Sequence, residues 1–364
     1  MGVFEKLFGS HREMDYNRLS GRIKNLYFII RRGNVLRQLI DRTKWYLAPK
    51  FFYVVGFPTH IDIETSVSCQ MRCPMCLRRQ VDPKLLSGIM DFDLYKKIID
   101  ECSERGVYSV KLSWRGEPLL NPRIVEMVKY AKNRGIKDVA FLTNGERLSP
   151  ELTVGLVEAG LDWISFSIDG LDDMYERIRY PATYEGIVKK VKYLKEYRDQ
   201  RGRNKPLIRV QTIYSAIKEN PSEYFRIWDK IADKVYVIAD QVRGDRVRFP
   251  QDPNYVCLEP WRRITIGWNG VVQQCITDYE EFNSLGDVKN QSLYEIWHGA
   301  KFNELRDLIK NKKIYTNNLC SICHDTGIMC EEVMRINGKD IKICVYTDQV
   351  IDFKNMDARP KART

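Results

Sequence analysis

Between residues 58 and 247, short apolar runs alternate with longer stretches in which apolar residues recur every three or four positions. A short apolar run is typical of a buried strand, and the longer period is typical of an amphipathic helix. Repeated strand-helix units of this kind predict parallel strands joined by right-handed crossovers. Six units predict an open parallel barrel of the α/β class. The expected strands are 61–64, 110–114, 138–142, 163–168, 208–213 and 234–239, and the expected helices are 93–103, 122–134, 150–159, 184–197 and 222–232.

The flanking regions have different patterns. Residues 16–56 carry apolar residues at helical spacing among arginines, so we expect residues 1–57 to form a basic, helical N-terminal segment. Residues 248–350 contain six of the ten cysteines and are expected to form a second domain. Residues 351–364 are mostly polar and basic, without an apolar period, and predict a disordered tail.

The composition is that of a globular protein with two or three domains. The chain has 364 residues, of which 44% are hydrophobic and 29% are charged. No apolar stretch approaches the roughly 20 residues of a membrane span, and the N-terminus lacks the apolar core of a secretion signal. We therefore expect a cytoplasmic protein. Ten cysteines grouped in short clusters favour metal or cluster binding over a disulfide framework.

The net charge of +11 favours acidic partners such as phosphorylated metabolites, nucleotide sugars, anionic lipids or nucleic acid. Residues 1–57 carry 11 Lys and Arg against 4 Asp and Glu, so much of the excess lies there. Together with the aromatic residues at 45–53, this segment is a candidate for peripheral contact with a membrane surface. A helical cap that packs on the next domain is the favoured reading of this segment.

Three cysteines, Cys69, Cys73 and Cys76, follow the first expected strand in a C-x3-C-x2-C loop. In parallel barrels chemistry gathers at the carboxyl ends of the strands, where this loop falls. Three thiolates can hold three irons of a 4Fe-4S cluster and leave the fourth iron open for a small ligand. A structural zinc site needs four closed ligands, so the odd count argues against zinc. The loop favours an iron-sulfur cluster over a zinc site or unligated core cysteines.

Motifs at the ends of the later strands follow in an order that resembles the radical S-adenosylmethionine (SAM) superfamily. Gly116, Glu117 and Pro118 follow the second expected strand and are similar to a motif that receives the amino group of SAM. A glycine lets the backbone approach a ligand, and a carboxylate accepts hydrogen bonds from an ammonium group. Outside this context the same three residues would be an ordinary turn.

The resemblance implies further SAM contacts at three strand ends. Asn144 ends the third strand, where an Asn-Gly turn is the alternative reading. Ser167 and Asp169 share one face at the end of the fourth strand, and Asp169 is also a candidate helix cap. Arg179 matches an arginine that reaches the SAM carboxylate, which suits a fork-shaped donor. A solvated surface arginine is the alternative there.

The C-terminal cysteines resemble the SPASM/twitch branch of this superfamily. Cys257, Gly270 and Cys275 are followed by the pair Cys320 and Cys323, which gives C-x12-G-x4-C and then C-x2-C. Four thiolates close a 4Fe-4S cluster completely, so this auxiliary cluster would transfer electrons rather than bind substrate. A zinc ribbon is the alternative.

The chain departs from a full SPASM domain, which usually carries about seven ligands for two auxiliary clusters, including a C-x3-C pair. Here the position that would complete such a pair with Cys330 is Met334. One auxiliary cluster is therefore favoured over two. Cys330 and Cys344 remain further candidate ligands, including in an arrangement where they join Cys320 and Cys323.

The resemblance implies a partial (β/α)6 TIM-like barrel with a C-terminal SPASM/twitch cluster domain and a short N-terminal helical segment. It also implies the chemistry: reductive cleavage of SAM gives a 5'-deoxyadenosyl radical, which abstracts hydrogen from a substrate C–H bond. A single auxiliary cluster favours oxidation or epimerisation of a sugar-type or cyclitol-type substrate.

A peptide-modifying maturase that installs a thioether or C–C crosslink is the alternative enzyme. A zinc-binding nucleic-acid-binding protein is a distant alternative, which the charge alone supports, and we expect no nucleic-acid partner. We expect an electron donor such as flavodoxin or ferredoxin. The sequence identifies no residue that removes a substrate proton.

Overall fold

The structure, a computed structural model, describes residues 13–14, 35–240, 250–347, 351 and 353. Six parallel strands form its centre and pair in the order of the sequence, which confirms the predicted α/β fold. Most of their residues are buried, as expected where helices cover a parallel sheet. The strands are β2 (His60–Ile63), β3 (Ser109–Lys111), β4 (Asp138–Thr143), β5 (Trp163–Ser167), β6 (Leu207–Ile213) and β7 (Lys234–Ile238).

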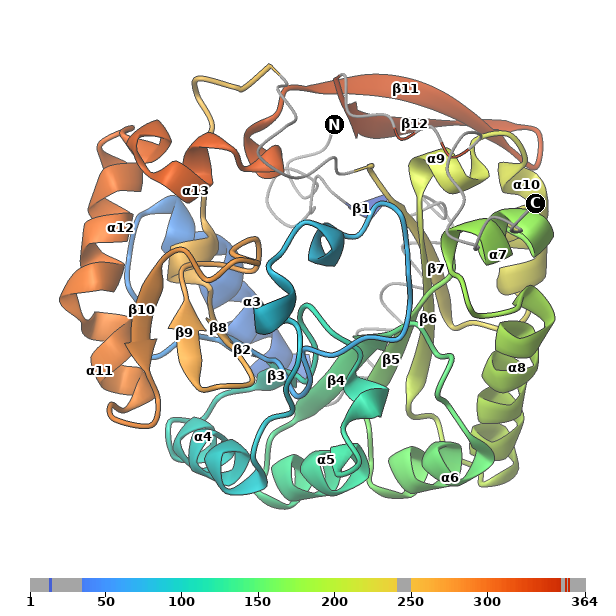
Figure 1. Ribbon diagram of the computed structural model, residues 1–364, viewed down its shortest axis with the longest axis horizontal. Helices are drawn as coiled ribbons and strands as arrows, with labels where there is room; N and C mark the ends of the chain where they lie inside the picture. Colours follow the sequence, from blue (N-terminus) through green and yellow to red (C-terminus); the bar gives the residue numbers. More distant parts are fainter. Residues whose placement is uncertain (1–12, 15–34, 241–249, 348–350, 352, 354–364) are drawn as a thin grey trace.

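Helices connect these strands and lie on the outside of the curved sheet (Figure 1). The Asp91 carboxylate caps the first of them by accepting hydrogen bonds from the backbone N–H groups of Asp93 and Leu94, both at 2.9 Å. All six predicted strands and all five predicted helices are present, with shifts at their ends. The helices are α4 (Phe92–Glu104), α5 (Ile124–Asn133), α6 (Pro150–Glu158), α7 (Asp172–Ile178), α8 (Tyr184–Gln200), α9 (Tyr214–Ile217) and α10 (Pro221–Trp228).

The C-terminal part continues the same sheet, which the sequence pattern did not predict. Strand β8 (Arg263–Ile266) pairs in parallel with β2, and β9 (Val271–Gln273) and β10 (Ser284–Asp287) follow in antiparallel order. Figure 1 shows α11 (Leu293–His298) and α12 (Ala300–Lys310), in orange, beside these strands. The barrel strands and the C-terminal strands are therefore held in one hydrogen-bonded sheet.

The last described elements are α13 (Asn318–Ser321) and a hairpin of β11 (Met329–Ile336) and β12 (Lys339–Tyr346). The hairpin packs against α10, and the backbone N–H of Asn337 at its turn donates to Ser222 Oγ at 2.9 Å. Short 3-10 turns join the larger elements. They are Leu77–Arg79, Pro83–Leu85, Pro118–Leu120, Glu259–Trp261, Ile314–Thr316 and His324–Thr326.

The N-terminal segment is only partly described. Helix α3 (Val35–Lys50) agrees with the predicted helical segment, whereas the first part of that segment, residues 16–34, lies outside the described residues. Strand β1 (Glu13–Met14) pairs with β7 in antiparallel order, although only helix was predicted before residue 57. The predicted tail also lies outside the described residues, apart from 351 and 353. Among the described helices, none is long and apolar enough to cross a membrane.

A buried arginine joins the end of β3 to the C-terminal part of the chain. Arg115 forms a bidentate ion pair with Glu64, with Nε–Oε1 and Nη2–Oε2 distances of 2.9 and 2.7 Å. The same guanidinium donates to Glu281 Oε1 at 2.8 Å and to the Tyr279 carbonyl at 2.8 Å. The Arg115 side chain and the Glu64 side chain are fully buried. Because β3 leaves the sheet here to reach residues 276–281, it is shorter than the predicted strand 110–114.

We expect the substitution Arg115→Met to destabilise the protein by about 3–5 kcal/mol, because it leaves the buried carboxylate of Glu64 and the partly buried carboxylate of Glu281 without their cation. The measurement is the free energy of unfolding from urea denaturation. Lys189→Met, which removes an exposed ion pair with Glu185 on α8, is the control and should leave that free energy unchanged within error. An Arg115→Met protein as stable as the wild type would contradict a structural role for this network.

Candidate active site and second cysteine cluster

The loop that carries Cys69, Cys73 and Cys76 follows β2 directly and lies at the carboxyl end of the barrel strands. The Cys73 side chain is buried, and the other two cysteines are half-buried. Burial raises the pKa of Cys73 to about 12, and the neighbouring guanidinium of Arg179 partly offsets this rise. Metal binding must therefore displace thiol protons, as it does in other cysteine sites.

At Gly116, the backbone that follows β3 packs directly against the start of this loop. A Cβ atom on Gly116 would lie 2.2 Å from the Ser66 carbonyl oxygen and 2.7 Å from the Ser68 carbonyl oxygen, so only glycine fits. The next residue, Glu117, donates its backbone N–H to the same Ser68 oxygen at 2.8 Å. The sequence motif at 116–118 is therefore the support on which the cysteine loop rests.

The Glu117 carboxylate is buried and points toward the end of β4. It accepts hydrogen bonds from Thr143 Oγ1 at 2.6 Å, from the Asn144 backbone N–H at 2.8 Å and from the Leu119 backbone N–H at 3.1 Å. Burial raises the pKa of Glu117 to about 7, although these three hydrogen bonds act in the opposite direction. A carboxylate has about four acceptor positions, so capacity for one further donor remains. Pro118 begins the 3-10 turn that follows.

Asn144 links this carboxylate to the cysteine loop. Its side-chain Nδ2 lies 3.7 Å from Cys69 Sγ, and its Oδ1 accepts from Gln70 Nε2 at 3.1 Å and from the Glu146 N–H at 2.9 Å. Among the described residues, Gln70 Oε1 is buried without a hydrogen-bond partner. Sequence reasoning did not single out Gln70, although it lies inside the cysteine motif.

Arg179 and Asp169 bind each other beside the same loop. Arg179 Nε donates to Asp169 Oδ2 at 2.7 Å, Nη2 makes a second hydrogen bond to that oxygen, and Nη1 lies 3.6 Å from Cys73 Sγ. The other oxygen of Asp169 accepts the Ile213 N–H at 3.0 Å, so Asp169 does not cap α7, whose N-cap is Leu171. We infer that Asp169 orients Arg179 toward the loop. Ser167 lies at the end of β5, half-buried, where it pairs in register with Gln211.

Tyr175 is a further residue of this site that sequence reasoning missed. It lies on α7, one turn before Arg179, and is fully buried. Its hydroxyl has no hydrogen-bond partner within the described part of the chain. Burial raises the pKa of Tyr175, and the nearby side chains of Cys73 and Asp169 add to the rise. Unpartnered polar atoms at Tyr175 and Gln70 are what a polar ligand beside the cysteine loop would satisfy, so the residues present fit a SAM site.

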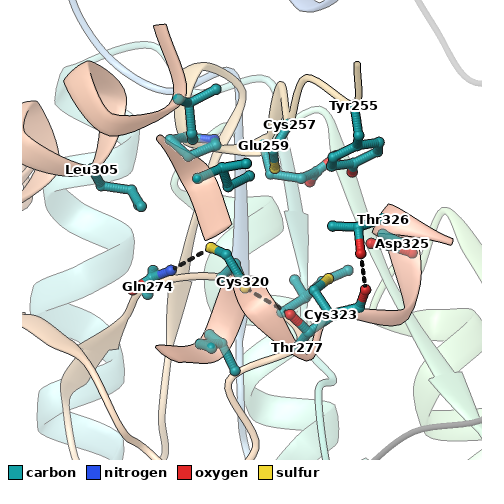
Figure 2. Close-up of a pocket in the computed structure, with 16 residues that line it drawn as sticks. Tyr255, Cys257, Glu259, Gln274, Thr277, Leu305, Cys320, Cys323, Asp325 and Thr326 are labelled. Carbon is teal, nitrogen blue, oxygen red and sulfur yellow. Dashed lines mark hydrogen bonds between the residues drawn. The ribbon is translucent and has the colours of Figure 1, made fainter. Parts of the chain in front are cut away.

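The second group of cysteines lines a pocket in the C-terminal domain (Figure 2). Each comes from a different point of the chain: Cys257 before the turn at 259–261, Cys275 after β9, Cys320 on α13 and Cys323 before the turn at 324–326. Burial raises the pKa of Cys275 and of Cys320. Apolar side chains form much of the remaining wall, namely Pro260, Leu305, Ile309, Ile314 and Leu319.

The structure does not bring Cys330 and Cys344 to this pocket. Cys330 is exposed on β11 and pairs in register with Val345, and Cys344 is half-buried on β12. Both lie on the hairpin and are not among the residues that line the pocket, so their role as further ligands, with or without Cys320 and Cys323, stays a prediction. Cys102 is buried in the core on α4.

Within the ranges that the structure describes, no three side chains of His, Cys, Asp or Glu converge as a site for a single metal ion. In a cubane cluster each cysteine binds a different iron, so the assignment to clusters rests on the shared loop and the shared pocket.

Two family models match the chain. Residues 63–202 match the model of the radical SAM superfamily, and residues 257–324 match the model of SPASM, an iron-sulfur cluster-binding domain. The first match covers the cysteine loop, and the second covers the four-cysteine pocket.

Among curated proteins, the chain is 24% identical over 316 residues to the tungsten-containing aldehyde ferredoxin oxidoreductase cofactor-modifying protein of Pyrococcus furiosus. That match covers 72% of this chain and 86% of the relative. The GTP 3',8-cyclase of Synechococcus sp. is 34% identical over 115 residues, which is 31% of this chain and about a third (32%) of the cyclase.

Solved structures show the same fold. The crystal structure of BtrN in complex with AdoMet and 2-DOIA matches with a TM-score of 0.52 and 20% identity, over 73% of this chain and 93% of BtrN. The structure of Streptococcus suis SuiB bound to precursor peptide SuiA matches with a TM-score of 0.53 and 16% identity, over 80% of this chain and 76% of SuiB.

We expect Gly116→Ala to remove the cluster of the first loop, because the new methyl group would displace backbone atoms of residues 66–68 rather than a flexible side chain. The measurement is iron and sulfide after anaerobic reconstitution, which should fall from about eight to about four per chain. Gly56→Ala is the matched control, because a Cβ there meets nothing within 4 Å. Full iron content in the Gly116→Ala protein would contradict the role of Gly116 in positioning the cysteine loop.

Proposed function

The chain belongs to the radical SAM superfamily and carries a C-terminal SPASM domain, and from this premise we propose that it oxidises or epimerises a sugar-type or cyclitol-type substrate. The observation that carries the proposal is the division of the cysteines: three lie on the first loop, four line one pocket, and the remaining three lie elsewhere. This division fits one radical-generating cluster and one auxiliary cluster, as in a sugar-modifying enzyme.

The first loop would hold a 4Fe-4S cluster through Cys69, Cys73 and Cys76. SAM bound there supplies, when reduced by one electron, the 5'-deoxyadenosyl radical that abstracts hydrogen from the substrate. The residues of this chain bind and orient SAM: Glu117 would accept from its amino group, and Arg179, held by Asp169, would donate to its carboxylate. Asn144 and Ser167 are the further proposed contacts.

The auxiliary site supports an oxidation. Conversion of an alcohol to a ketone removes two electrons and two protons. One electron and one proton leave together as the abstracted hydrogen atom. The second electron requires an acceptor, which an auxiliary cluster held by Cys257, Cys275, Cys320 and Cys323 would provide, and the second proton leaves to solvent. Solved structures of this fold include BtrN, with AdoMet and 2-DOIA, and SuiB, with precursor peptide SuiA, so the fold is compatible with either substrate class.

The proposal includes the partners expected from the sequence. A flavodoxin or ferredoxin would supply the electron that initiates the reaction, in the cytoplasm. Peripheral membrane contact through residues 1–57 remains a prediction, since much of that segment lies outside the described residues.

The wild-type protein, reconstituted anaerobically, should contain about eight irons per chain, and the triple variant Cys69→Ala/Cys73→Ala/Cys76→Ala about four. With a reductant, SAM and a panel of sugar nucleotides and cyclitols, the wild type should form 5'-deoxyadenosine and an oxidised or epimerised product. Both should be absent from the triple variant. Chromatography with mass spectrometry provides the readout.

Cys102→Ala is the matched control, because it removes a cysteine that lies in the core of the barrel. It should keep the wild-type iron content. About twelve irons per chain, with turnover of a peptide and no sugar, would favour the peptide-modifying alternative. Zinc in place of iron would refute the radical chemistry.

We expect SAM binding to weaken as the pH falls through about 7, because protonation removes the charge of Glu117 that the SAM amino group meets. The sign follows from the raised pKa: the carboxylate is ionised above this value and neutral below it. The apparent dissociation constant should rise about tenfold for each pH unit below the pKa. The measurement is SAM affinity of the anaerobic holoprotein across this range.

Glu117→Gln is the comparison protein and should bind SAM weakly at every pH. Parallel pH profiles of the wild type and Glu117→Gln would show that the titration of Glu117 does not cause the pH dependence of SAM binding.

A further inference from the structure

Two side chains of the four-cysteine pocket make hydrogen bonds to cysteine sulfur atoms. Gln274 Nε2 lies 3.2 Å from Cys320 Sγ, and Thr277 Oγ1 lies 2.8 Å from Cys275 Sγ. We propose that Gln274 and Thr277 raise the reduction potential of the auxiliary cluster by donating hydrogen bonds to two of its thiolate ligands. This inference rests on the ligand set given under the proposed function.

The Gln274 amide is held in place by a second amide. Asn317 Nδ2 donates to Gln274 Oε1 at 3.0 Å, and Gln274 Nε2 also reaches Asn317 Oδ1 at 3.2 Å. Asn317 in turn caps α13, since its Oδ1 accepts from the backbone N–H groups of Leu319 and Cys320 at 3.1 and 3.2 Å. The Gln274 side chain is buried, and Figure 2 shows it pointing at Cys320. Its NH2 group is therefore fixed toward the sulfur by the same helix that carries the ligand.

Once a metal is bound, only Thr277 can be the donor in the hydrogen bond between Thr277 and Cys275. Either partner could donate when Cys275 is a thiol. A thiolate that binds iron has no proton, so the Thr277 hydroxyl must then be the donor. Thr277 lies two residues after Cys275, in the loop that Trp114 also holds through a hydrogen bond to the Ile276 carbonyl at 2.8 Å.

The apolar wall of the pocket strengthens these two hydrogen bonds. Much of the pocket wall is apolar, and a hydrogen bond is electrostatically stronger in such a medium than in water. The carboxylates in the lining already have cationic or histidine neighbours: Glu259 pairs with Arg263 at 2.5 Å, and Asp325 with His324 at 2.9 Å. Donors to a ligand sulfur withdraw electron density and favour the reduced cluster. A higher potential would suit a cluster that accepts an electron from a substrate radical.

The experiment uses the Cys69→Ala/Cys73→Ala/Cys76→Ala protein as background, so that only the auxiliary cluster contributes to the spectrum. The reduction potential is measured by titration followed with electron paramagnetic resonance. We expect Thr277→Val and Gln274→Met each to shift the potential to more negative values. Because the two side chains contact different sulfur atoms, the shifts should add in the double variant.

Two matched variants separate these bonds from changes in packing. Thr277→Ser retains the hydroxyl and should restore the potential of the background protein. Thr326→Val removes a hydroxyl from the same pocket, but that hydroxyl donates to the Cys323 carbonyl oxygen at 2.7 Å and not to a sulfur. It should leave the potential unchanged.

Unchanged potentials in both Thr277→Val and Gln274→Met, with the cluster intact, would overturn the proposal. A shift in Thr326→Val as large as in Thr277→Val would also overturn it, because the effect would then follow from packing. A background protein that assembles no four-iron cluster would refute the ligand set itself, and with it this inference. That failure is distinguishable, because it appears in the iron content before any titration.

Discussion

The close approach of two backbone segments is the constraint on which the first site depends. The end of β3 and the segment 66–68 touch at Gly116, where even a methyl group has no room. This contact fixes where the cysteine loop begins relative to the strand ends. Glu117 and Asn144 then lie within reach of Cys69, and Arg179 within reach of Cys73. The thiols and the polar groups of the site are thus positioned by backbone packing, which a flexible loop could not achieve.

The shared sheet extends this control to the second site. Strand β2 leads into the first cysteine loop, its parallel neighbour β8 leads into β9, and Cys275 follows β9. Arg115 bridges the same two regions through Glu64 and the Tyr279 carbonyl. Because ladder hydrogen bonds and a buried ion pair both join the two regions, the two cysteine groups belong to one hydrogen-bonded framework. Their separation is therefore a property of the fold.

Much of the barrel could be predicted from the sequence, because its strands are mostly buried and rich in apolar residues, and they alternate with longer helical stretches. The C-terminal strands could not be placed in the same way. Their apolar runs are short, as in Val271–Gln273, and nothing in a run shows that β8 would pair with β2, some 200 residues earlier. The hairpin β11–β12 was missed because cysteine spacing directed the interpretation of 329–346 toward metal ligands.

The candidate site likewise combines features that the sequence predicts with contacts that it does not predict. The cysteines and the glycine-glutamate motif could be found because their spacing along the chain is short. The contacts between strand ends could not, because Glu117 meets Thr143 only when β3 and β4 pair. Asp169 is instructive, since its position at a strand end suggested a ligand contact or a helix cap. The structure shows an ion pair with Arg179, from which we infer that Asp169 orients that arginine. This contact depends on the path of α7.

The two cysteine groups differ in their polar environment, and the difference matches their proposed tasks. The first has a guanidinium, a titratable carboxylate and buried polar atoms without partners, all of which suit a charged ligand that enters and leaves. The second has neutral donors, Gln274 and Thr277, held by local hydrogen bonds within an apolar wall. Neutral donors stabilise added electron density without adding a net charge to the pocket. A site built in this way suits the passage of electrons, whereas the first site suits the binding of a reactant.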